Sequence, residues 1–369
     1  MEKILYVATV DIHIKTFHLP YLKMLHDMGY EVHVATNGKE EFPNCDKKHT
    51  ICIERSPYKL NNIKAIKQLK KIIDKEKFDI IHCHTPMGAV VARLAAKNAR
   101  KKYGTRVIYT AHGFHFYKGA PLLNWLLFYP IEWYLSKYTD TLITINHEDE
   151  ILALRKFSKR CENIVRIPGI GVDNSKFDEK MTNAKENKLR KEFNLDVNDF
   201  VIIYPARLCK DKNQKLLLDF MKINKNVNIK LLLAGKDEYN GYYQKYVTEN
   251  KIDNVQFLGH RTDVIDLLRI SNLLVATSIR EGFGINLVEA LACKIPVIAV
   301  DNRGHREIVK NGINGYIISN KVDELFKIIN ILCDKNNEYI KLIDNCYNTA
   351  SEFFLDKSLN AMEIIYDQI

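Results

Sequence analysis

The stretch REGFGINLVEALACKIPVIAVDNRG, residues 280–304, decides the fold of the second half of the chain. It follows a strand-like apolar run, LLVATS (273–278), and it turns through Gly282 and Gly284 before a helical pattern begins near Ile285. The apolar run PVIAV comes next and is typical of a buried strand. A strand, a glycine turn, a helix and a second strand in this order predict a parallel sheet that is covered by helices.

The same alternation extends from one end of the chain to the other. The strand-like runs are KILYVATV (3–10), EVHVAT (31–36), DIIHCHT (79–85), RVIYTAHG (106–113), TLITIN (141–146), FVIIYPARL (200–208), IKLLLAGK (229–236), VQFLGH (255–260), LLVATS and PVIAV. The polar stretch 173–193 interrupts the pattern. We therefore predict an α/β protein with two Rossmann-like, doubly wound domains, over residues 1–180 and 181–350, and a last helix over 351–369.

The composition sets the class of protein. The chain has 369 residues, 46% of them hydrophobic, which suffices for two domains with separate cores. The apolar run at the N-terminus is short and has no cleavage-site pattern, and no segment reaches the ~18 apolar residues of a membrane span. The eight cysteines are scattered without a Cys-x-x-Cys pair. This pattern favours free thiols in a reducing cytoplasm over disulfides or a zinc site.

The positive charge lies in the first half of the chain. The net charge is +10, and residues 1–180 hold 29 basic against 20 acidic residues. Residues 51–106 alone hold 14 basic and 4 acidic residues. Such a region suits nucleic acid, an anionic membrane or a phosphorylated substrate. Solvated lysine-rich helix faces are the alternative, and the region lacks a recognisable nucleic-acid-binding motif.

Two cations follow the run FVIIYPA. Arg207 comes directly after it, and Lys212 stands five positions later. A guanidinium can hold two phosphate oxygens and an ammonium adds a point charge, so this pair suits a diphosphate. Two solvated loop cations are the alternative interpretation.

Two carboxylates, Glu281 and Glu289, flank the glycine turn. The glycines allow backbone amides to approach a ligand, and the start of the following helix directs its free amides and positive dipole end to the same place. Glu289 lies just over one turn into that helix, where a carboxylate accepts hydrogen bonds from hydroxyl groups. The pattern suits a ligand with an anionic and a hydroxylated part, such as a sugar nucleotide. The alternative is an ordinary helix with two surface glutamates.

Together these motifs resemble family-4 retaining glycosyltransferases, which have the two-domain GT-B fold. Residues 281–289 match the Glu-x7-Glu signature of that family, and ARLCKDKN (206–213) matches its Arg-Leu-x-x-x-Lys loop. GIGVDNSKF (169–177) resembles the turn before the linker, and residues 301–318 resemble the closing segment. The resemblance covers essentially the whole chain. It implies that the two domains face a cleft and that the last helix packs back on the first domain.

The first half is similar to bacterial capsule and exopolysaccharide transferases, in particular the EpsD-like proteins. The similarity rests on residues 8–38, on IIHCHTPMGAVVARLAA (80–96) and on residues 110–146. One departure concerns the first loop, where many family members carry a Gly-Gly pair. Here that loop reads TVDIHIKTFH (9–18).

The resemblance assigns roles to single residues. The catalytic set that it implies is His112, Glu281, Arg207 and Lys212. The donor-binding set is Gly282, Phe283, Gly284, Glu289, Arg207, Lys212 and Arg261. In these sets Glu289 holds the ribose hydroxyls, and Glu281 and His112 lie near the transferred sugar.

The remaining candidates concern the acceptor and metals. The residues expected on the acceptor side are His13, Lys15, His84 and His115. His82 and His84 lack an obvious third ligand as a metal pair, and the chain has no Asp-x-Asp motif. We therefore expect no cofactor and no divalent metal, with Arg207 and Lys212 neutralising the leaving diphosphate.

The aromatic segment GAPLLNWLLFYPIEWYLSKY (119–138) is interrupted by Asn124, Pro130 and Glu132, so it cannot span a bilayer. It suits either a membrane interface or the core of the first domain. An interfacial position beside the basic region agrees with an acceptor carried on undecaprenyl diphosphate at the inner face of the cell membrane.

The sequence thus predicts a retaining hexosyltransferase. It would move an N-acetylhexosamine, from UDP-GlcNAc or UDP-GalNAc, to a lipid-diphosphate-linked saccharide in capsule or exopolysaccharide synthesis. Two alternatives are a non-catalytic GT-B partner of another transferase and a different enzyme on the same fold, such as a sugar-nucleotide epimerase or a phosphorylase.

Overall fold

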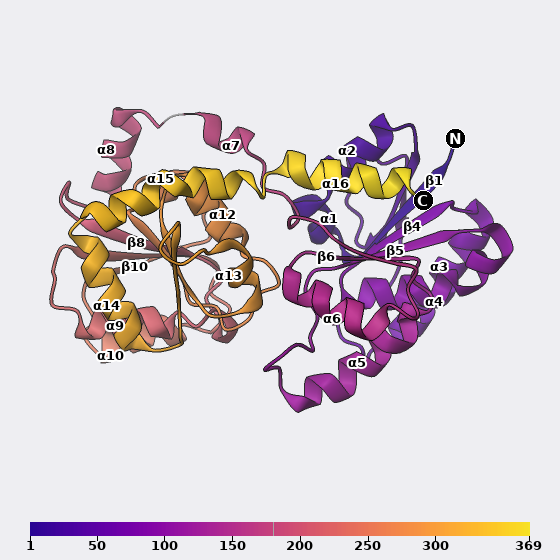
Figure 1. Ribbon diagram of the computed structural model, residues 1–369, viewed down its shortest axis with the longest axis horizontal. Coiled ribbons are helices and arrows are strands. Elements are labelled where there is room, and N and C mark those ends of the chain that lie inside the picture. Colours follow the sequence, from indigo (N-terminus) through magenta and orange to yellow (C-terminus); the bar gives the residue numbers. More distant parts are fainter. Residues whose placement is uncertain (180) are drawn as a thin grey trace. The chain divides into compact units, whose positions relative to one another are not determined.

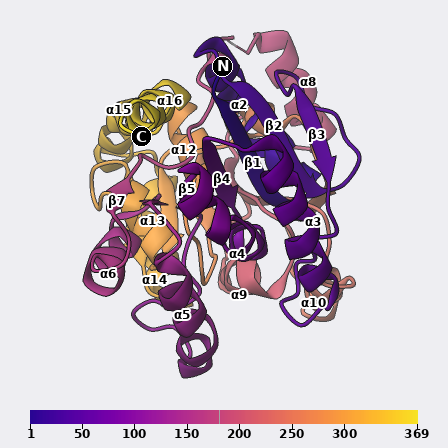
Figure 2. The same ribbon diagram turned by 90° about the vertical axis from the view of Figure 1, so that its right-hand side faces the viewer.

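The computed structural model describes residues 1–179 and 181–369, and the chain divides into two compact units. The first unit contains Met1–Ile170 together with Asp356–Ile369, and the second contains Gly171–Leu355. Lys180, the last residue of the predicted first domain, lies outside the described residues. Each unit is built around one sheet with helices on both of its faces (Figure 1; Figure 2).

The sheet of the first unit has seven parallel strands in the order β3-β2-β1-β4-β5-β6-β7. Its strands are β1 (Lys3–Val10), β2 (Glu31–Asn37), β3 (Lys47–Thr50), β4 (Ile80–His84), β5 (Arg106–Ala111), β6 (Thr141–Thr144) and β7 (Asn163–Arg166). Its helices are α1 (Asp11–Phe17), α2 (Leu19–Asp27), α3 (Asn61–Glu76), α4 (Pro86–Tyr103), α5 (Leu122–Ser136), α6 (His147–Phe157) and α16 (Leu355–Asp367). The strand order reverses between β1 and β4, and ligands of such sheets bind beyond the carboxyl ends of the strands at this point.

The second unit repeats this plan with six parallel strands in the order β10-β9-β8-β11-β12-β13. Its strands are β8 (Phe200–Pro205), β9 (Ile229–Ala234), β10 (Val255–Gly259), β11 (Leu273–Ala276), β12 (Val297–Val300) and β13 (Gly315–Ile318). Its helices are α7 (Ser175–Asp178), α8 (Asn183–Glu192), η1 (Lys210–Lys212), α9 (Lys215–Ile223), α10 (Tyr242–Glu249), α11 (Val264–Arg269), α12 (Ile285–Ala292), α13 (Arg303–Ile308), α14 (Val322–Cys333) and α15 (Asn337–Ser351). The order reverses between β8 and β11. The predicted pair of doubly wound parallel sheets is confirmed.

Helical spacing explains how the sheet of the first unit is covered. Helix α3 buries Ala65, Leu69 and Ile73, which are four residues apart and therefore lie on one face, while most of its lysines face water. Helix α4 approaches the sheet closely through Gly88, since a Cβ there would lie 3.1 Å from the Cα of Ala8 in β1. Small residues on α4 thus bring this helix directly over the switch point of the sheet.

The prediction of a loop at residues 9–18 is wrong, because most of this segment forms helix α1. Asp11 explains the difference. Its buried carboxylate accepts hydrogen bonds from the Thr36 hydroxyl and the Glu40 amide, and it pairs with Lys48 at 2.9 Å. An acidic residue in the first turn also favours a helix through the helix dipole. The strands β3, β7 and β13 are not among the predicted runs either, since each is a four-residue edge strand that is only partly buried.

The C-terminal helix α16 is part of the first unit, as predicted for the last helix. Its Tyr366 hydroxyl lies 2.6 Å from the hydroxyl of Tyr6 in β1 and 2.5 Å from Nδ1 of His82 in β4. The second ring nitrogen of His82 lies 2.7 Å from the Thr110 hydroxyl in β5. Three central strands and the last helix are thereby joined through one buried polar network.

Helix α5 is fixed to the first unit by a buried ion pair. Glu132, one of the residues that interrupt the aromatic segment, accepts a 2.8 Å hydrogen bond from Arg93 of α4. The Arg93 guanidinium is 1% exposed and lies 4.3 Å from the ring centre of Tyr109. Burial of a charge without a partner is very costly, so this pair holds α5 in place.

Across residues 1–179 and 181–369, helices with the length and hydropathy that a bilayer span requires are absent.

We predict that Glu132→Ala destabilises the first unit by about 3–5 kcal/mol, because it leaves the Arg93 charge buried and unpaired. Urea unfolding followed by circular dichroism measures the loss. The matched control is Glu162→Ala, which removes the partner of Arg106 in an exposed pair (2.9 Å, Glu162 57% exposed) and should cost less than about 1 kcal/mol. Equal losses in the two variants would contradict the assignment.

Candidate active site

In the second unit, the polar loops that follow β8, β11 and β12 are joined at one edge of the sheet. Asn302, shortly after β12, donates a 2.9 Å hydrogen bond to the carbonyl oxygen of Ser278, after β11. Its side-chain oxygen also accepts from the amide of His305 at 3.0 Å, which caps α13. Asn286 at the start of α12 donates to the carbonyl of Pro205 at the end of β8, at 3.3 Å. These bonds make the strand ends one rigid frame.

The ion pair between Lys212 and Glu281 lies within this frame. The Ser278 hydroxyl donates to the same carboxylate at 2.8 Å, and the buried Tyr204 hydroxyl lies 2.6 Å from the Ser278 oxygen. Thr277 fixes the other partner, because its hydroxyl donates to the carbonyl of Lys212 at 2.9 Å. A predicted diphosphate-binding cation and a predicted sugar-binding carboxylate are therefore brought together and held by β8 and β11.

The glycine turn is shaped by the start of helix α13, which follows β12. A Cβ on Gly304 would lie 2.9 Å from the Cβ of Glu281 and 2.9 Å from the amide nitrogen of Phe283, so only glycine fits here without a shift. Phe283 packs edge to face on Phe353, with ring centres 5.5 Å apart. The amides of Ile285 and Asn286 at the start of α12 come directly after this turn, while those of Leu287 and Val288 already donate to the Gly284 carbonyl oxygen. The turn therefore presents backbone donors beside the Glu281 carboxylate.

Glu289 lies in α12 with only part of its side chain exposed. Burial raises its pKa to about 7, and the nearby charge of Lys176 offsets part of this shift. None of the side-chain hydrogen bonds among the described residues involves its carboxylate. A half-buried carboxyl group without a partner has unused capacity to accept hydrogen bonds from a ligand.

Two predicted donor-binding cations are engaged elsewhere. Arg207 is exposed and pairs with Glu238, which follows β9. Arg261 is bound by Asp263 at 2.6 Å and by Glu192 at 3.5 Å. The second unit thus places Lys212 next to Glu281, while Arg207 must exchange its carboxylate partner before it can hold a phosphate.

In the first unit, three predicted residues gather at the strand switch point. His84 ends β4, His112 follows β5, and His13 belongs to α1. Nε2 of His112 lies 3.4 Å from Nδ1 of His84, and the His13 ring lies 4.9 Å from that of His112 between centres. Lys15 points instead to Glu40, at 3.0 Å. His115 lies against Phe128 of α5, with ring centres 4.6 Å apart, so it does not join the other histidines.

The sequence interpretation left out several residues that shape these sites. His18 ends the segment 9–18 and has no role in the sequence prediction, yet its Nε2 lies 3.2 Å from Nε2 of His13. The polar residues Tyr204, Ser278 and Asn302 were not proposed at all. The position of Ser278 and Asn302 shortly after strands is the signal that could have identified them.

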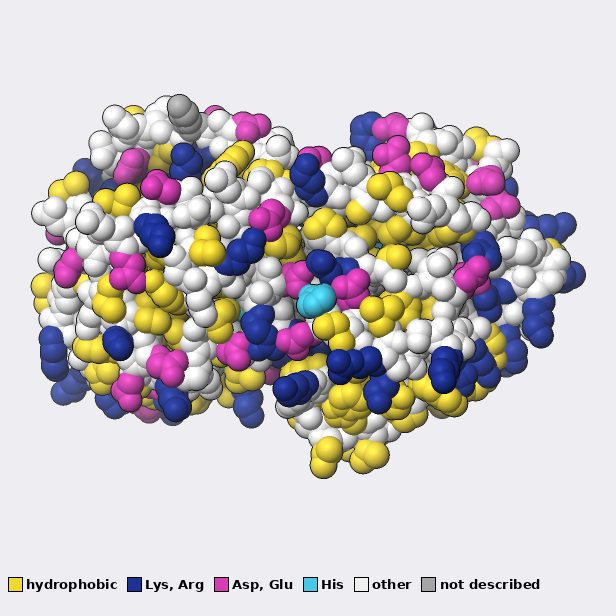
Figure 3. Space-filling view, viewed as in Figure 1, with side chains coloured by type: hydrophobic (Ala, Val, Ile, Leu, Met, Phe, Trp, Pro, Cys, Tyr) yellow, Lys and Arg dark blue, Asp and Glu magenta, His cyan; other side chains and the backbone are white. Residues whose placement is uncertain are grey.

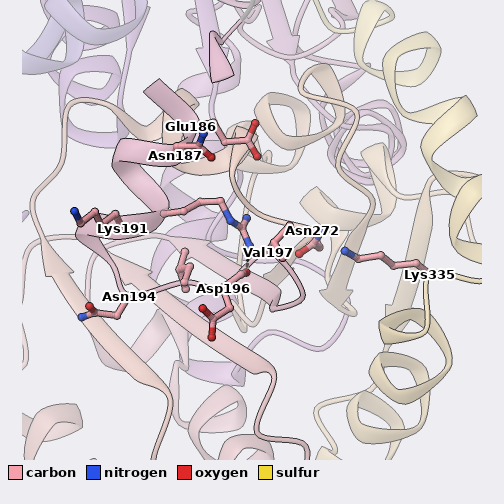
Figure 4. A pocket seen from close by; sticks show the side chains of 10 residues that line it. Glu186, Asn187, Lys191, Asn194, Asp196, Val197, Asn272 and Lys335 are labelled. Carbon is pink, nitrogen blue, oxygen red and sulfur yellow. Dashed lines mark hydrogen bonds between the residues drawn. The ribbon is translucent and has the colours of Figure 1, made fainter. Parts of the chain in front are cut away.

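The second unit also has a polar cavity, which is shown in Figure 4. It is lined by Glu186, Asn187, Arg190, Lys191, Asn194, Leu195, Asp196, Val197, Asn272 and Lys335. Asp196 and Val197 precede β8, and Asn272 precedes β11. The cavity therefore lies at the amino ends of these parallel strands, opposite the edge that carries Glu281.

Comparisons with known proteins agree with this geometry. Residues 185–349 match the family model "Glycosyl transferases group 1", and residues 3–146 match "Glycosyl transferase 4-like". The chain is 46% identical over 322 residues to EpsD of Bacillus subtilis (strain 168), which covers 86% of this chain and 83% of that protein. The chain therefore belongs to the family-4-like glycosyltransferases with the GT-B fold.

Two further relatives extend the comparison. An Escherichia coli protein, UDP-Gal:alpha-D-GlcNAc-diphosphoundecaprenol alpha-1,3-galactosyltransferase, is 26% identical over 326 residues, 86% of this chain and 82% of its own. The crystal structure of Anabaena Alr3699/HepE in complex with UDP-glucose superposes with a TM-score of 0.81 at 20% identity and covers 100% of both chains. The second comparison supports the fold alone.

The raised pKa of Glu289 predicts a pH-dependent stability. With a folded pKa of about 7 and an ordinary value of 4.5, the native state binds the extra proton between these values, so stability falls as pH rises from 5 to 8. Glu289→Gln removes this titration. Its free energy of unfolding, relative to that of the wild type, should therefore rise by about 2–3 kcal/mol between pH 5 and pH 8. Urea unfolding at both pH values measures it. An exposed glutamate on α10 provides the control, Glu249→Gln, which should keep the wild-type slope. A wild-type slope in Glu289→Gln would contradict the prediction.

Proposed function

We propose that the protein is a retaining hexosyltransferase that transfers a sugar from a UDP-sugar to a lipid-diphosphate-linked saccharide. The observation that carries the proposal is the Lys212–Glu281 ion pair beside the start of α12, since it combines a cation for phosphate with a carboxylate for hydroxyl groups. The E. coli relative, which acts on a diphosphoundecaprenol-linked sugar, supports the acceptor class. An N-acetylhexosamine remains the donor sugar that we propose.

The donor is proposed to bind along the carboxyl edge of the second sheet. The carboxylate of Glu289 would accept hydrogen bonds from the ribose hydroxyls, since it has unused acceptor capacity. The diphosphate would lie at the first-turn amides of α12 and beside Lys212, and it would draw Arg207 away from Glu238.

The mechanism that we propose depends on where charge develops during the transfer. The bond between C1 of the sugar and the diphosphate oxygen breaks, and positive charge develops on the sugar ring while negative charge grows on the leaving UDP. Lys212, Arg207 and the α12 amides would stabilise this negative charge and make a divalent metal unnecessary. With retention, the acceptor hydroxyl attacks from the face of the leaving group, and a phosphate oxygen takes its proton.

The test is UDP release in the presence of EDTA, with a panel of UDP-hexoses and UDP-N-acetylhexosamines and with or without a lipid-diphosphate-linked saccharide. We expect release with one donor and only with acceptor. Lys212→Met and Arg207→Ala should lower kcat by about 10²–10³, as for the loss of one donor to a developing anion. Glu289→Ala should mainly raise KM.

The matched control for these variants is Lys210→Met, which removes the same charge from the exposed start of the same short helix, η1. It should keep wild-type rates. Normal rates in Lys212→Met would exclude the proposed site. Wild type that binds no UDP in calorimetry and releases none would favour the second candidate, a non-catalytic partner of another transferase.

We also propose that α5 rests on an anionic membrane at the inner face of the cell membrane. Its Trp125, Phe128 and Tyr129 pack against the core of the first unit, while Leu122 and Leu126 are 81% and 72% exposed. Figure 3 shows apolar side chains at the lower edge of the molecule, over α5, with basic side chains beside them. An exposed apolar face of this kind suits insertion into a lipid interface.

Cations surround the aromatic side chains of α5. The Arg160 guanidinium lies 3.5 Å from the ring centre of Trp133, and the Lys137 ammonium lies 3.9 Å from that of Tyr134. Aromatic rings at headgroup level and basic groups beside anionic lipids are the pairing that peripheral membrane proteins use. This arrangement favours an interfacial position of the aromatic segment over a core position.

We predict that the protein floats with vesicles that contain anionic lipid and not with vesicles of neutral lipid alone. The double variant Leu122→Glu and Leu126→Glu should lose flotation, because it places two charges in the apolar face. The control Val197→Glu and Val227→Glu adds the same charge at exposed apolar sites of the second unit (83% and 70% exposed) and should float as wild type does. Flotation that is indifferent to anionic lipid, or equal loss in both double variants, would contradict the membrane proposal.

A further inference from the structure

Four histidines of the first unit converge on one point. His13, His18, His84 and His112 each direct one ring nitrogen to it, and these four nitrogens all lie within 4.8 Å of one another. They come from α1, from the residue between α1 and α2, from the end of β4 and from the segment after β5. Among the described residues, this is the one group of three or more potential metal ligands.

Two pairs within this group are already at hydrogen-bonding distance. Nε2 of His13 and of His18 are 3.2 Å apart, and Nε2 of His112 and Nδ1 of His84 are 3.4 Å apart. Tetrahedral zinc with Zn–N bonds of about 2.1 Å would place its ligand nitrogens ~3.4 Å from one another. The two short pairs already have this separation, and the others need to close by little more than 1 Å.

His84 differs from His82, the buried histidine beside it, in its ring-nitrogen contacts. Its Nε2 is buried and has no hydrogen-bond partner within residues 1–179 and 181–369. Nδ1 is the nitrogen that faces His112, so the ion would bind there and the unpaired Nε2 takes no part in its coordination. The adjacent His82 differs, because Tyr366 and Thr110 engage both of its nitrogens. The quartet is therefore chemically distinct from its buried neighbour.

From these contacts we propose that His13, His18, His84 and His112 form a binding site for one Zn²⁺ ion in the first unit. All four ligands are imidazole nitrogens, a set that suits zinc and other late first-row ions and does not suit Mg²⁺ or Ca²⁺, which prefer oxygen. The site is separate from the proposed metal-free chemistry at the donor diphosphate. It can be tested without any sugar donor.

Zinc in this site would connect α1, β4 and β5, three segments that meet at the switch point of the sheet. Because the ion binds only the folded arrangement, it stabilises the first unit by linkage. A rise in the thermal unfolding midpoint with added Zn²⁺ is thus a second readout, independent of activity.

The experiment uses untagged, full-length protein that has been stripped with a chelator and then titrated with Zn²⁺ in calorimetry. We expect one ion per chain. His13→Ala with His112→Ala should weaken binding by at least about 100-fold, since even the loss of an outer-shell partner costs about 10- to 100-fold. His26→Ala with His260→Ala removes two exposed histidines outside the quartet and should keep wild-type affinity and the thermal shift.

Titration with Co²⁺ tests the ligand type. Four nitrogen ligands should give weak visible bands without the intense near-ultraviolet band of a cobalt–thiolate bond, which the eight free cysteines would otherwise supply. Absence of saturable binding at micromolar Zn²⁺ would overturn the proposal. So would a thiolate band, or binding that survives in the His13 and His112 double variant.

Discussion

Parallel pairing of the strands is the constraint on which the rest of this molecule depends. A parallel strand can follow another only after the chain has crossed a face of the sheet, so most crossovers add a helix, although the one from β2 to β3 does not, and every strand ends at the same edge. In both sheets the connections also reverse direction once, between β1 and β4 and between β8 and β11. The histidines of the first unit and the Lys212–Glu281 pair of the second lie after the strands at these two reversals. The positions of the chemically active side chains are therefore a consequence of topology.

Much of this arrangement could be predicted from the sequence, because long runs such as KILYVATV and FVIIYPARL are buried on both faces and carry a strong pattern. Edge strands such as Lys47–Thr50 could not be predicted, since a strand with one neighbour and exposed side chains has no apolar run. Helix α1 was also missed. Its sequence contains two β-branched isoleucines and a histidine, and the helix depends on contacts of Asp11 with residues 25 or more positions away.

The same limit applies to the candidate site. The motifs placed Glu281, Lys212 and the glycine turn correctly after their strands. They could not indicate that Arg207 pairs with Glu238, since that contact depends on the side-chain direction in a loop after a different strand. Nor could spacing reveal that His18 meets His84, 66 positions away in the sequence, with ring centres 4.0 Å apart. Residues that meet across a sheet are specified by strand order, and local periodicity does not encode strand order.

The return of α16 to the first unit has a consequence for how the protein is made. Residues 356–369 belong to the unit that begins at Met1, and Tyr366 completes the buried polar network of Tyr6 and His82. Tyr366 is therefore synthesised after the whole of the second unit, which ends at Leu355. During translation the second unit, which is continuous in sequence, is able to complete its fold first, while the first unit waits with buried polar groups unpaired. The unit that is begun first thus receives its last partner after the other unit has been synthesised.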